Sequence, residues 1–216
     1  MNPTPTPSVS PLHLARPLAL CLLALWFAAA VLAGAAGWLV SWPSFAVPAL
    51  VWALTGVVTW SYFTRAEVRG WIEAIGLRRL IALHVIRFVG VAFLLLAAAG
   101  RLPRTWALGA GWGDIIVAAL AAALLLVSAP RLPRLAYAWN WIGLVDLVFV
   151  IGGAGVLNFR TPEQLTEMTR LPMVLLPTFF VPLLLASHFI IFDLLRTARP
   201  PRASASAVDK GARRGG

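Results

Sequence analysis

Six apolar runs of membrane-spanning length constrain this chain more than any other feature. About 20 residues of helix cross a hydrocarbon core of about 30 Å, because an α-helix rises 1.5 Å per residue. The runs are residues 17–40, 45–64, 80–99, 112–127, 135–157 and 171–195. We therefore predict an all-α, polytopic membrane protein with six transmembrane helices.

Composition excludes a soluble protein. Charged residues make up 12% of the chain and apolar residues 60%, whereas soluble domains are about 25% charged. The net charge of +10 would suggest nucleic acid in a soluble protein. Here the basic residues lie mainly at the ends of the apolar runs and in the C-terminal tail, so the expected partner is the lipid bilayer and not nucleic acid. A single cysteine, Cys21, excludes an intramolecular disulfide and a thiolate metal site.

The distribution of Lys and Arg predicts orientation. Thirteen lie on the side of the two termini, four lie on the opposite side, and Arg87 lies within the third run. Cytoplasmic loops carry the excess of positive charge, so we expect both termini in the cytoplasm.

Three of the segments outside the expected spans have features of their own. Residues 1–16 are rich in Pro, Ser and Thr, and residues 197–216 are basic and of low complexity, so both tails are predicted to be disordered around a domain at 17–196. Residues 65–79 carry a stripe of Val68, Trp71, Ile72 and Ile75. This pattern fits either a short helix along the membrane surface or an ordinary loop.

Five polar residues interrupt the third, fifth and sixth runs at similar depth in the cytoplasmic half of the membrane. They are His84, Arg87, Asn140, Asp146 and His188. Because a bare arginine at mid-membrane costs about 3 kcal/mol on insertion scales, Arg87 needs a partner. We predict an Arg87–Asp146 ion pair. The cluster is either a functional site or polar contacts that only fix which helices are neighbours.

Asp114 and three prolines are expected to act mainly on helix ends and helix shape. Asp114 follows a Gly-rich stretch at the expected start of the fourth run, where it would cap a helix or mark an outer site. Pro172, Pro177 and Pro182 are expected to kink the sixth helix, since each removes a backbone donor. Freed carbonyls between Phe180 and His188 could line a pathway.

Three short motifs carry a resemblance that covers about residues 80–195. They are Gly111-Trp-Gly-Asp114, Asn140-x-x-Gly-x-x-Asp146 and Pro177-Thr-Phe-Phe-Val-Pro182-x5-His188. In these the chain resembles uncharacterised bacterial six-span integral membrane proteins. The resemblance implies a bacterial inner-membrane location and brings no activity, cofactor or catalytic residue.

Three functions fit these residues. The first is transport of a small solute or ion, or proton relay, through the polar cluster, in a chain small enough to need a homodimer. The second is a non-catalytic subunit or scaffold of a membrane complex. The third is a b-type haem protein with His84 and His188 as axial ligands; no other cofactor or metal is expected. The spans contain no Ser/His/Asp set, HExxH motif or paired acids, so enzyme activity is not predicted.

Overall fold

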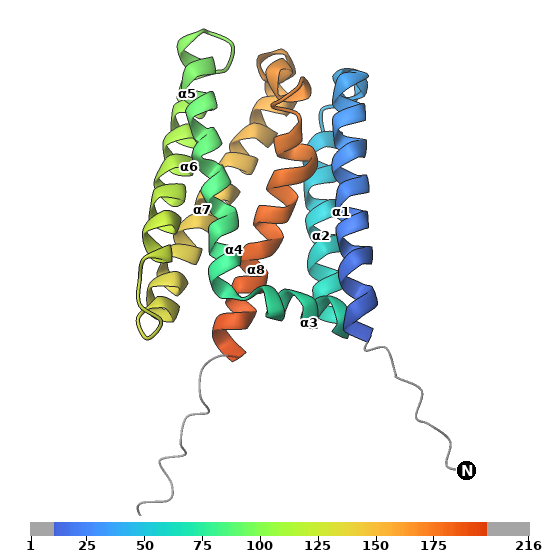
Figure 1. The fold of residues 1–216 in the computed structure, drawn as a ribbon. Helices are drawn as coiled ribbons and strands as arrows, with labels where there is room; N and C mark the ends of the chain where they lie inside the picture. Colours follow the sequence, from blue (N-terminus) through green and yellow to red (C-terminus); the bar gives the residue numbers. More distant parts are fainter. Residues whose placement is uncertain (1–10, 198–216) are drawn as a thin grey trace, which may run out of the picture.

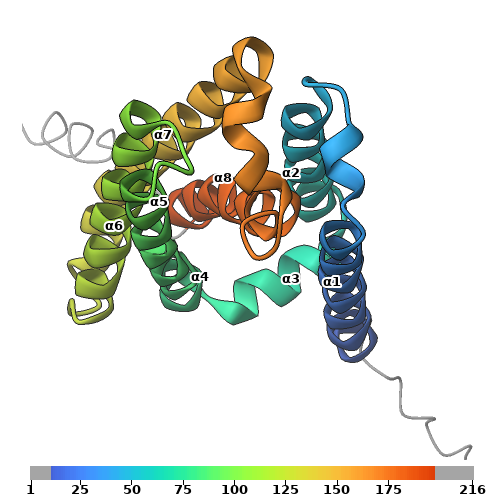
Figure 2. The same cartoon turned by 90° about the horizontal axis from the view of Figure 1, so that it is seen from above.

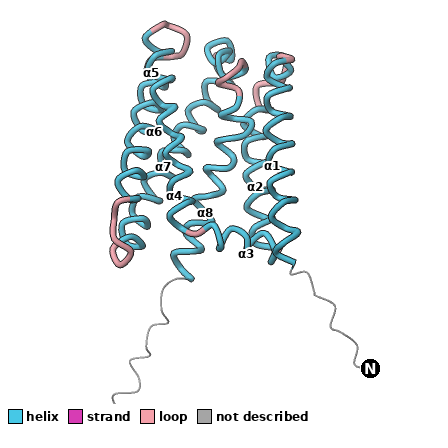
Figure 3. The backbone as a smooth tube through the Cα atoms, in the orientation of Figure 1, coloured by secondary structure: helices cyan, strands magenta, loops and turns pink. Residues whose placement is uncertain are grey.

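The computed structural model describes the backbone of residues 11–197 and the side chains of residues 17–197. This part of the chain consists of helices joined by short loops, without a strand (Figure 3). Six of its helices are long and apolar enough to cross a membrane. The prediction of an all-helical chain with six membrane-length helices is confirmed. Residues 1–10 and 198–216, which make up most of the two tails predicted to be disordered, lie outside the described residues.

The spans run side by side, and one short helix lies across their ends (Figure 1). The elements, in chain order, are α1 Pro11–Ala35, η1 Trp38–Ser41, α2 Ala46–Thr64, α3 Ala66–Ile75, α4 Leu77–Leu83, η2 His84–Val89, α5 Gly90–Ala98, α6 Arg104–Leu125, α7 Leu132–Arg160, η3 Pro162–Thr169, η4 Leu176–Phe180 and α8 Val181–Thr197. We refer below to the α3 end and the η3 end of the bundle. The first residue of α1 and the last of α8 both lie at the α3 end.

Helix α8 forms the centre of the bundle, with the other spans around it (Figure 2). The burial pattern agrees, because 56% of the apolar window of the last span is buried and only 6% of that of α1. Ser187 and His188 of α8 are therefore buried between the surrounding helices.

Helix α3 packs its apolar stripe against the bundle. Ile72 is buried, and Val68, Trp71 and Ile75 contact the same core cluster. Of the two interpretations left open for residues 65–79, the structure contains the amphipathic helix. Its Arg69 lies 5.3 Å from the ring centre of Tyr62, and the Tyr62 hydroxyl donates to Oδ2 of Asp193 at 2.8 Å. These contacts join α3, α2 and α8.

The third span is continuous from Leu77 to Ala98, but its middle is a 3₁₀ segment, η2. A 3₁₀ helix has three residues per turn, so side chains three apart lie directly above one another. His84 and Arg87 therefore point from the same side of η2 into the bundle, and both are buried.

Several helix boundaries differ from the expected ones. Helix α1 begins at Pro11, inside the segment expected to be a disordered tail, because proline suits the first turn of a helix. Helix α6 begins at Arg104, eight residues before the expected Trp112, and its glycines lie within the helix. Two glycines allow α5 and α6 to lie close together. A Cβ on Gly90 or on Gly111 would lie within 2.8 Å of the carbonyl oxygen of the other residue, so the two helices pack backbone against backbone there.

The last span begins at Leu176 instead of Leu171, and it begins with a π-helical turn, η4. Pro172 lies before this turn, so it kinks no helix, and that expectation was wrong. Pro182 has no amide hydrogen to donate to Thr178 O, four residues earlier. The indole Nε1 of Trp26 donates to that oxygen at 2.8 Å. The carbonyl freed by Pro182 therefore binds α1 and does not line a pathway between Phe180 and His188.

Candidate functional site

A buried arginine lies at the centre of the bundle between two carboxylates. The side chain of Arg87 is 1% exposed. Its Nε donates to Oδ1 of Asp114 at 2.6 Å, and its Nη2 donates to Oδ2 of Asp146. Its Nη1 donates to the carbonyl oxygen of Gly143 at 3.2 Å. We call Arg87, Asp114 and Asp146 the charge triad. The ion pair predicted between Arg87 and Asp146 is present, and Asp114 is a second partner.

The position of Asp114 corrects its interpretation as a helix cap or outer site. Because α6 starts at Arg104, Asp114 lies near the middle of the helix, and its side chain is 8% exposed. Pro103, directly before the first helical residue, is the sequence signal that could have moved this boundary, since proline is common where helices begin. With that start, a rise of 1.5 Å per residue places Asp114 at roughly the depth of Arg87.

The charge triad has one positive and two negative groups. With both carboxylates ionised, its formal charge is −1. An uncompensated charge in a low-dielectric interior is costly, so the triad needs one further positive charge, which a proton or another monovalent cation can supply.

The two carboxylates face different surroundings. Asp114 and Arg87 line an elongated, mainly apolar cavity of about 100 Å³ inside the bundle. Asp146 instead lies in a shallow surface depression with apolar residues of α7, and its side chain is 15% exposed. Arg87 is thus shared between a group that faces the interior cavity and a group that faces the outside of the bundle.

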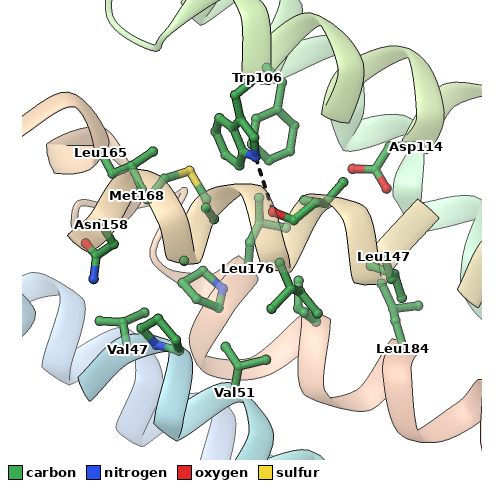
Figure 4. A pocket seen from close by; sticks show the side chains of 18 of the residues that line it. Val47, Val51, Trp106, Asp114, Leu147, Asn158, Leu165, Met168, Leu176 and Leu184 are labelled. Carbon is green, nitrogen blue, oxygen red and sulfur yellow. Dashed lines mark hydrogen bonds between the residues drawn. The ribbon is translucent and has the colours of Figure 1, made fainter. Parts of the chain in front are cut away.

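The cavity extends from the charge triad toward the η3 end (Figure 4). Asp114 lies at one end of the view and Asn158 at the other, with Trp106 on one wall and Val47 and Val51 opposite. A second, more polar depression of about 350 Å³ between η1 and η3 shares Val47, Asn158 and Thr169 with this cavity. The two hollows are therefore adjacent, and the second lies on the η3 side of the first.

The histidines form a second polar group, on the α3 side of the triad. His84 Nε2 bonds Ser187 Oγ at 2.8 Å, and His188 Nδ1 bonds Asn140 Oδ1 at 2.7 Å. Asn140 Nδ2 also donates to the backbone oxygen of His188 at 2.9 Å. The two ring centres are 4.4 Å apart, and both residues are fully buried. Sequence reasoning missed Ser187, because a serine within a span is usually only a local backbone contact.

The five polar residues expected to converge are thus brought together, divided between the triad and the histidine group; four of them are buried, and Asp146 lies at the outer surface of α7. Pro177 lines the cavity, and Pro182 is buried at the start of α8. Within the described residues, no group of three or more His, Cys, Asp or Glu side chains is arranged to hold a metal ion.

The histidine pair does not fit a haem. Two imidazoles on opposite sides of one iron keep their ring centres about 6 Å apart, since each metal–nitrogen bond is about 2 Å long. The observed 4.4 Å leaves no space for a porphyrin between the rings.

The model of a protein family described as a domain of unknown function (DUF8737) matches residues 44–196. This range contains the charge triad, the histidine pair and every span except α1. No curated protein and no solved structure matched the chain.

Proposed function

We propose that this chain, which belongs to the DUF8737 family, is a membrane transporter that exchanges a proton for a small organic cation at the charge triad. The observation that carries the proposal is the sharing of one buried arginine by two carboxylates at the inner end of an apolar cavity. The missing positive charge can be a proton or the charge of a bound cation. Since both occupants neutralise the same group, they compete, and competition is the basis of exchange.

The walls of the cavity indicate the class of solute. They are mainly apolar, and apolar cavities of this kind stay dry and hold apolar molecules. Phe93 and Trp106 contribute aromatic rings, which attract cations through their faces. A cavity of about 100 Å³ suits an ion with few carbon atoms. A small alkylammonium ion meets all three conditions.

Asp114 is the residue that we expect to contact the solute. It lines the cavity, and only its Oδ1 is bound by Arg87. Its Oδ2 accepts no hydrogen bond from any residue in the described part of the chain. That oxygen can accept a proton or an ammonium N–H, or pair with the charge of a quaternary ammonium ion that has no N–H, without breaking the bond to Arg87.

The direct test is proton release on binding. Tetramethylammonium, methylammonium and n-butylammonium chloride are added to the purified protein in weakly buffered detergent solution with a pH indicator dye, and sodium chloride serves as the control salt. We expect about one proton released per chain for the alkylammonium ions and none for sodium. Asp114→Asn should abolish the release, whereas Glu67→Gln, which changes an exposed carboxylate on α3, should not. Failure of all three ions to release a proton contradicts the proposal.

For location, we propose the bacterial inner membrane, with both termini in the cytoplasm. Support comes from the thirteen Lys and Arg residues on the side of the termini against four on the other. The cavity would then open toward the periplasm. Reporter fusions at the C-terminus test this: a fluorescent protein should be active there and alkaline phosphatase inactive.

For assembly, we propose a homodimer, because six helices are few for a transporter. Mass measurement of the protein in nanodiscs tests this expectation, and a single chain per disc that still exchanges protons contradicts it.

The alternative of a non-catalytic subunit or scaffold is favoured by one observation. All the bonds of Arg87 end on other spans, so the triad also holds α6 and α7 to the third span. A scaffold would lose stability in triad variants but would release no proton when alkylammonium ions are added.

A further inference from the structure

The tautomers of His84 and His188 are determined by their partners. Ser187 Oγ donates its only hydrogen to Leu184 O at 2.7 Å, so toward His84 it can only accept, and His84 Nε2 carries the hydrogen. Asn140 Oδ1 can only accept, so His188 Nδ1 carries the hydrogen.

This leaves one bare nitrogen on each ring. His84 Nδ1 and His188 Nε2 are buried and have no hydrogen-bond partner among the described residues. Buried polar atoms without partners are rare in proteins, and each one calls for an explanation. Two such atoms on adjacent rings, both of them lone-pair acceptors, form a place that can receive a proton.

Gly143 connects the histidine pair to the charge triad. Its carbonyl oxygen accepts from Arg87 Nη1. A Cβ on Gly143 would lie 2.6 Å from His188 Cε1 and 3.1 Å from His188 Nε2. Only glycine therefore leaves space beside the bare nitrogen of His188, at the residue that also binds the triad.

We infer that His84 and His188 form a proton relay: the proton that leaves Asp114 or Asp146 when a cation binds at the triad passes over this pair before it is released to water at the α3 end. This inference rests on the proposed exchange at the triad and adds its path toward the α3 end. In the transfer, the O–H bond of the carboxylic acid breaks, an N–H bond forms at a bare imidazole nitrogen, and the products are a carboxylate and an imidazolium.

Burial and charge explain why the pair passes the proton on. His84 and His188 are fully buried beside the fixed positive charge of Arg87, so an imidazolium there is unfavourable and does not accumulate.

The test is ¹⁵N NMR of the full chain in nanodiscs, with ¹⁵N-labelled histidine. The chain has three histidines, His13, His84 and His188, and His13→Gln simplifies the assignment. Without added cation we expect hydrogen on His84 Nε2 and on His188 Nδ1, with a bare nitrogen on each ring. Tetramethylammonium should leave both bare nitrogens unprotonated at equilibrium, because the proton is released. Hydrogen on His84 Nδ1 or on His188 Nε2, with or without the cation, overturns the inference, since the rings then offer no acceptor nitrogen for the relay.

A matched pair of glycine variants provides the second readout. In Gly143→Ala the added methyl group occupies the space beside His188 Nε2, whereas a Cβ at Gly152, on the same helix, has no atom within 4 Å. We expect Gly143→Ala to slow alkylammonium-induced proton release roughly tenfold or more, and Gly152→Ala to leave its rate unchanged. Equal rates in both variants overturn the inference but leave exchange at the triad intact. Loss of proton release from the unmodified protein would instead contradict the proposed function.

Discussion

Gly113 lies where the carboxylate of Asp146 packs against α6, so close that a Cβ at position 113 would overlap Oδ1 of Asp146. The ion pair of Asp146 with Arg87 therefore depends on the absence of a side chain at Gly113 of α6. A carboxylate of α7 can reach an arginine of the third span only because α6 presents bare backbone at this point.

Gly113→Ala should therefore displace Asp146 and destabilise the protein by about 1–3 kcal/mol, as overpacking in a filled interior does. In Gly152→Ala the added Cβ has no atom within 4 Å, so this variant should be neutral or stabilising by up to about 1 kcal/mol, because alanine favours the helix. Thermal unfolding in detergent, followed by circular dichroism, measures the difference. Equal stability of the two variants would show that Asp146 does not lie against α6.

Removing the arginine alone should cost more than removing the whole triad. Arg87→Met leaves two carboxylates in the interior without their partner, and breaking a buried pair in this way costs about 3–5 kcal/mol. The triple variant Arg87→Met, Asp114→Asn, Asp146→Asn leaves no charge at the site and should recover most of that loss. A triple variant less stable than Arg87→Met would contradict the charge balance described above.

The sequence predicted what depends on span length and on the cost of charge in lipid. The lengths of the apolar runs predicted six helices, and the free-energy cost of burying Arg87 predicted a partner for it, Asp146. Asp114 was assigned to a cap because its depth depended on where α6 begins, and helix ends are the least certain feature of an apolar run. The bare nitrogens of the histidines could not be anticipated, since they follow from hydrogen bonds between helices distant in the sequence.

Trp26 and Pro182 should be energetically coupled. In the native chain the Trp26 indole supplies the hydrogen bond to Thr178 O that Pro182 cannot. Trp26→Phe should therefore cost about 1 kcal/mol for the hydrogen bond. In a Pro182→Ala background an amide hydrogen is available to that oxygen, so the same change should cost less. A double-mutant cycle on unfolding free energies measures the coupling, and strict additivity would contradict it.

Filling the cavity should block exchange without unfolding the protein. Gly155 lines the cavity, and a Cβ there meets no atom within 4 Å, so Gly155→Leu extends into open space. We expect alkylammonium-induced proton release to be lost while the melting temperature stays within a few degrees of that of the unmodified protein. Gly152→Leu, on the same helix but outside the cavity lining, is the control and should release the proton normally. Normal release by Gly155→Leu would show that the solute does not use this cavity.

Transport driven by a proton gradient tests the central claim most directly. Proteoliposomes with an acidic interior are diluted into alkaline buffer containing radiolabelled tetramethylammonium, and uptake is compared between the unmodified chain and the triple variant of Arg87, Asp114 and Asp146. If the charge triad exchanges protons for cations, the unmodified chain accumulates the label as protons leave, and the folded triple variant accumulates none above protein-free vesicles. Equal uptake by both proteins, or none by the unmodified chain, would contradict the account.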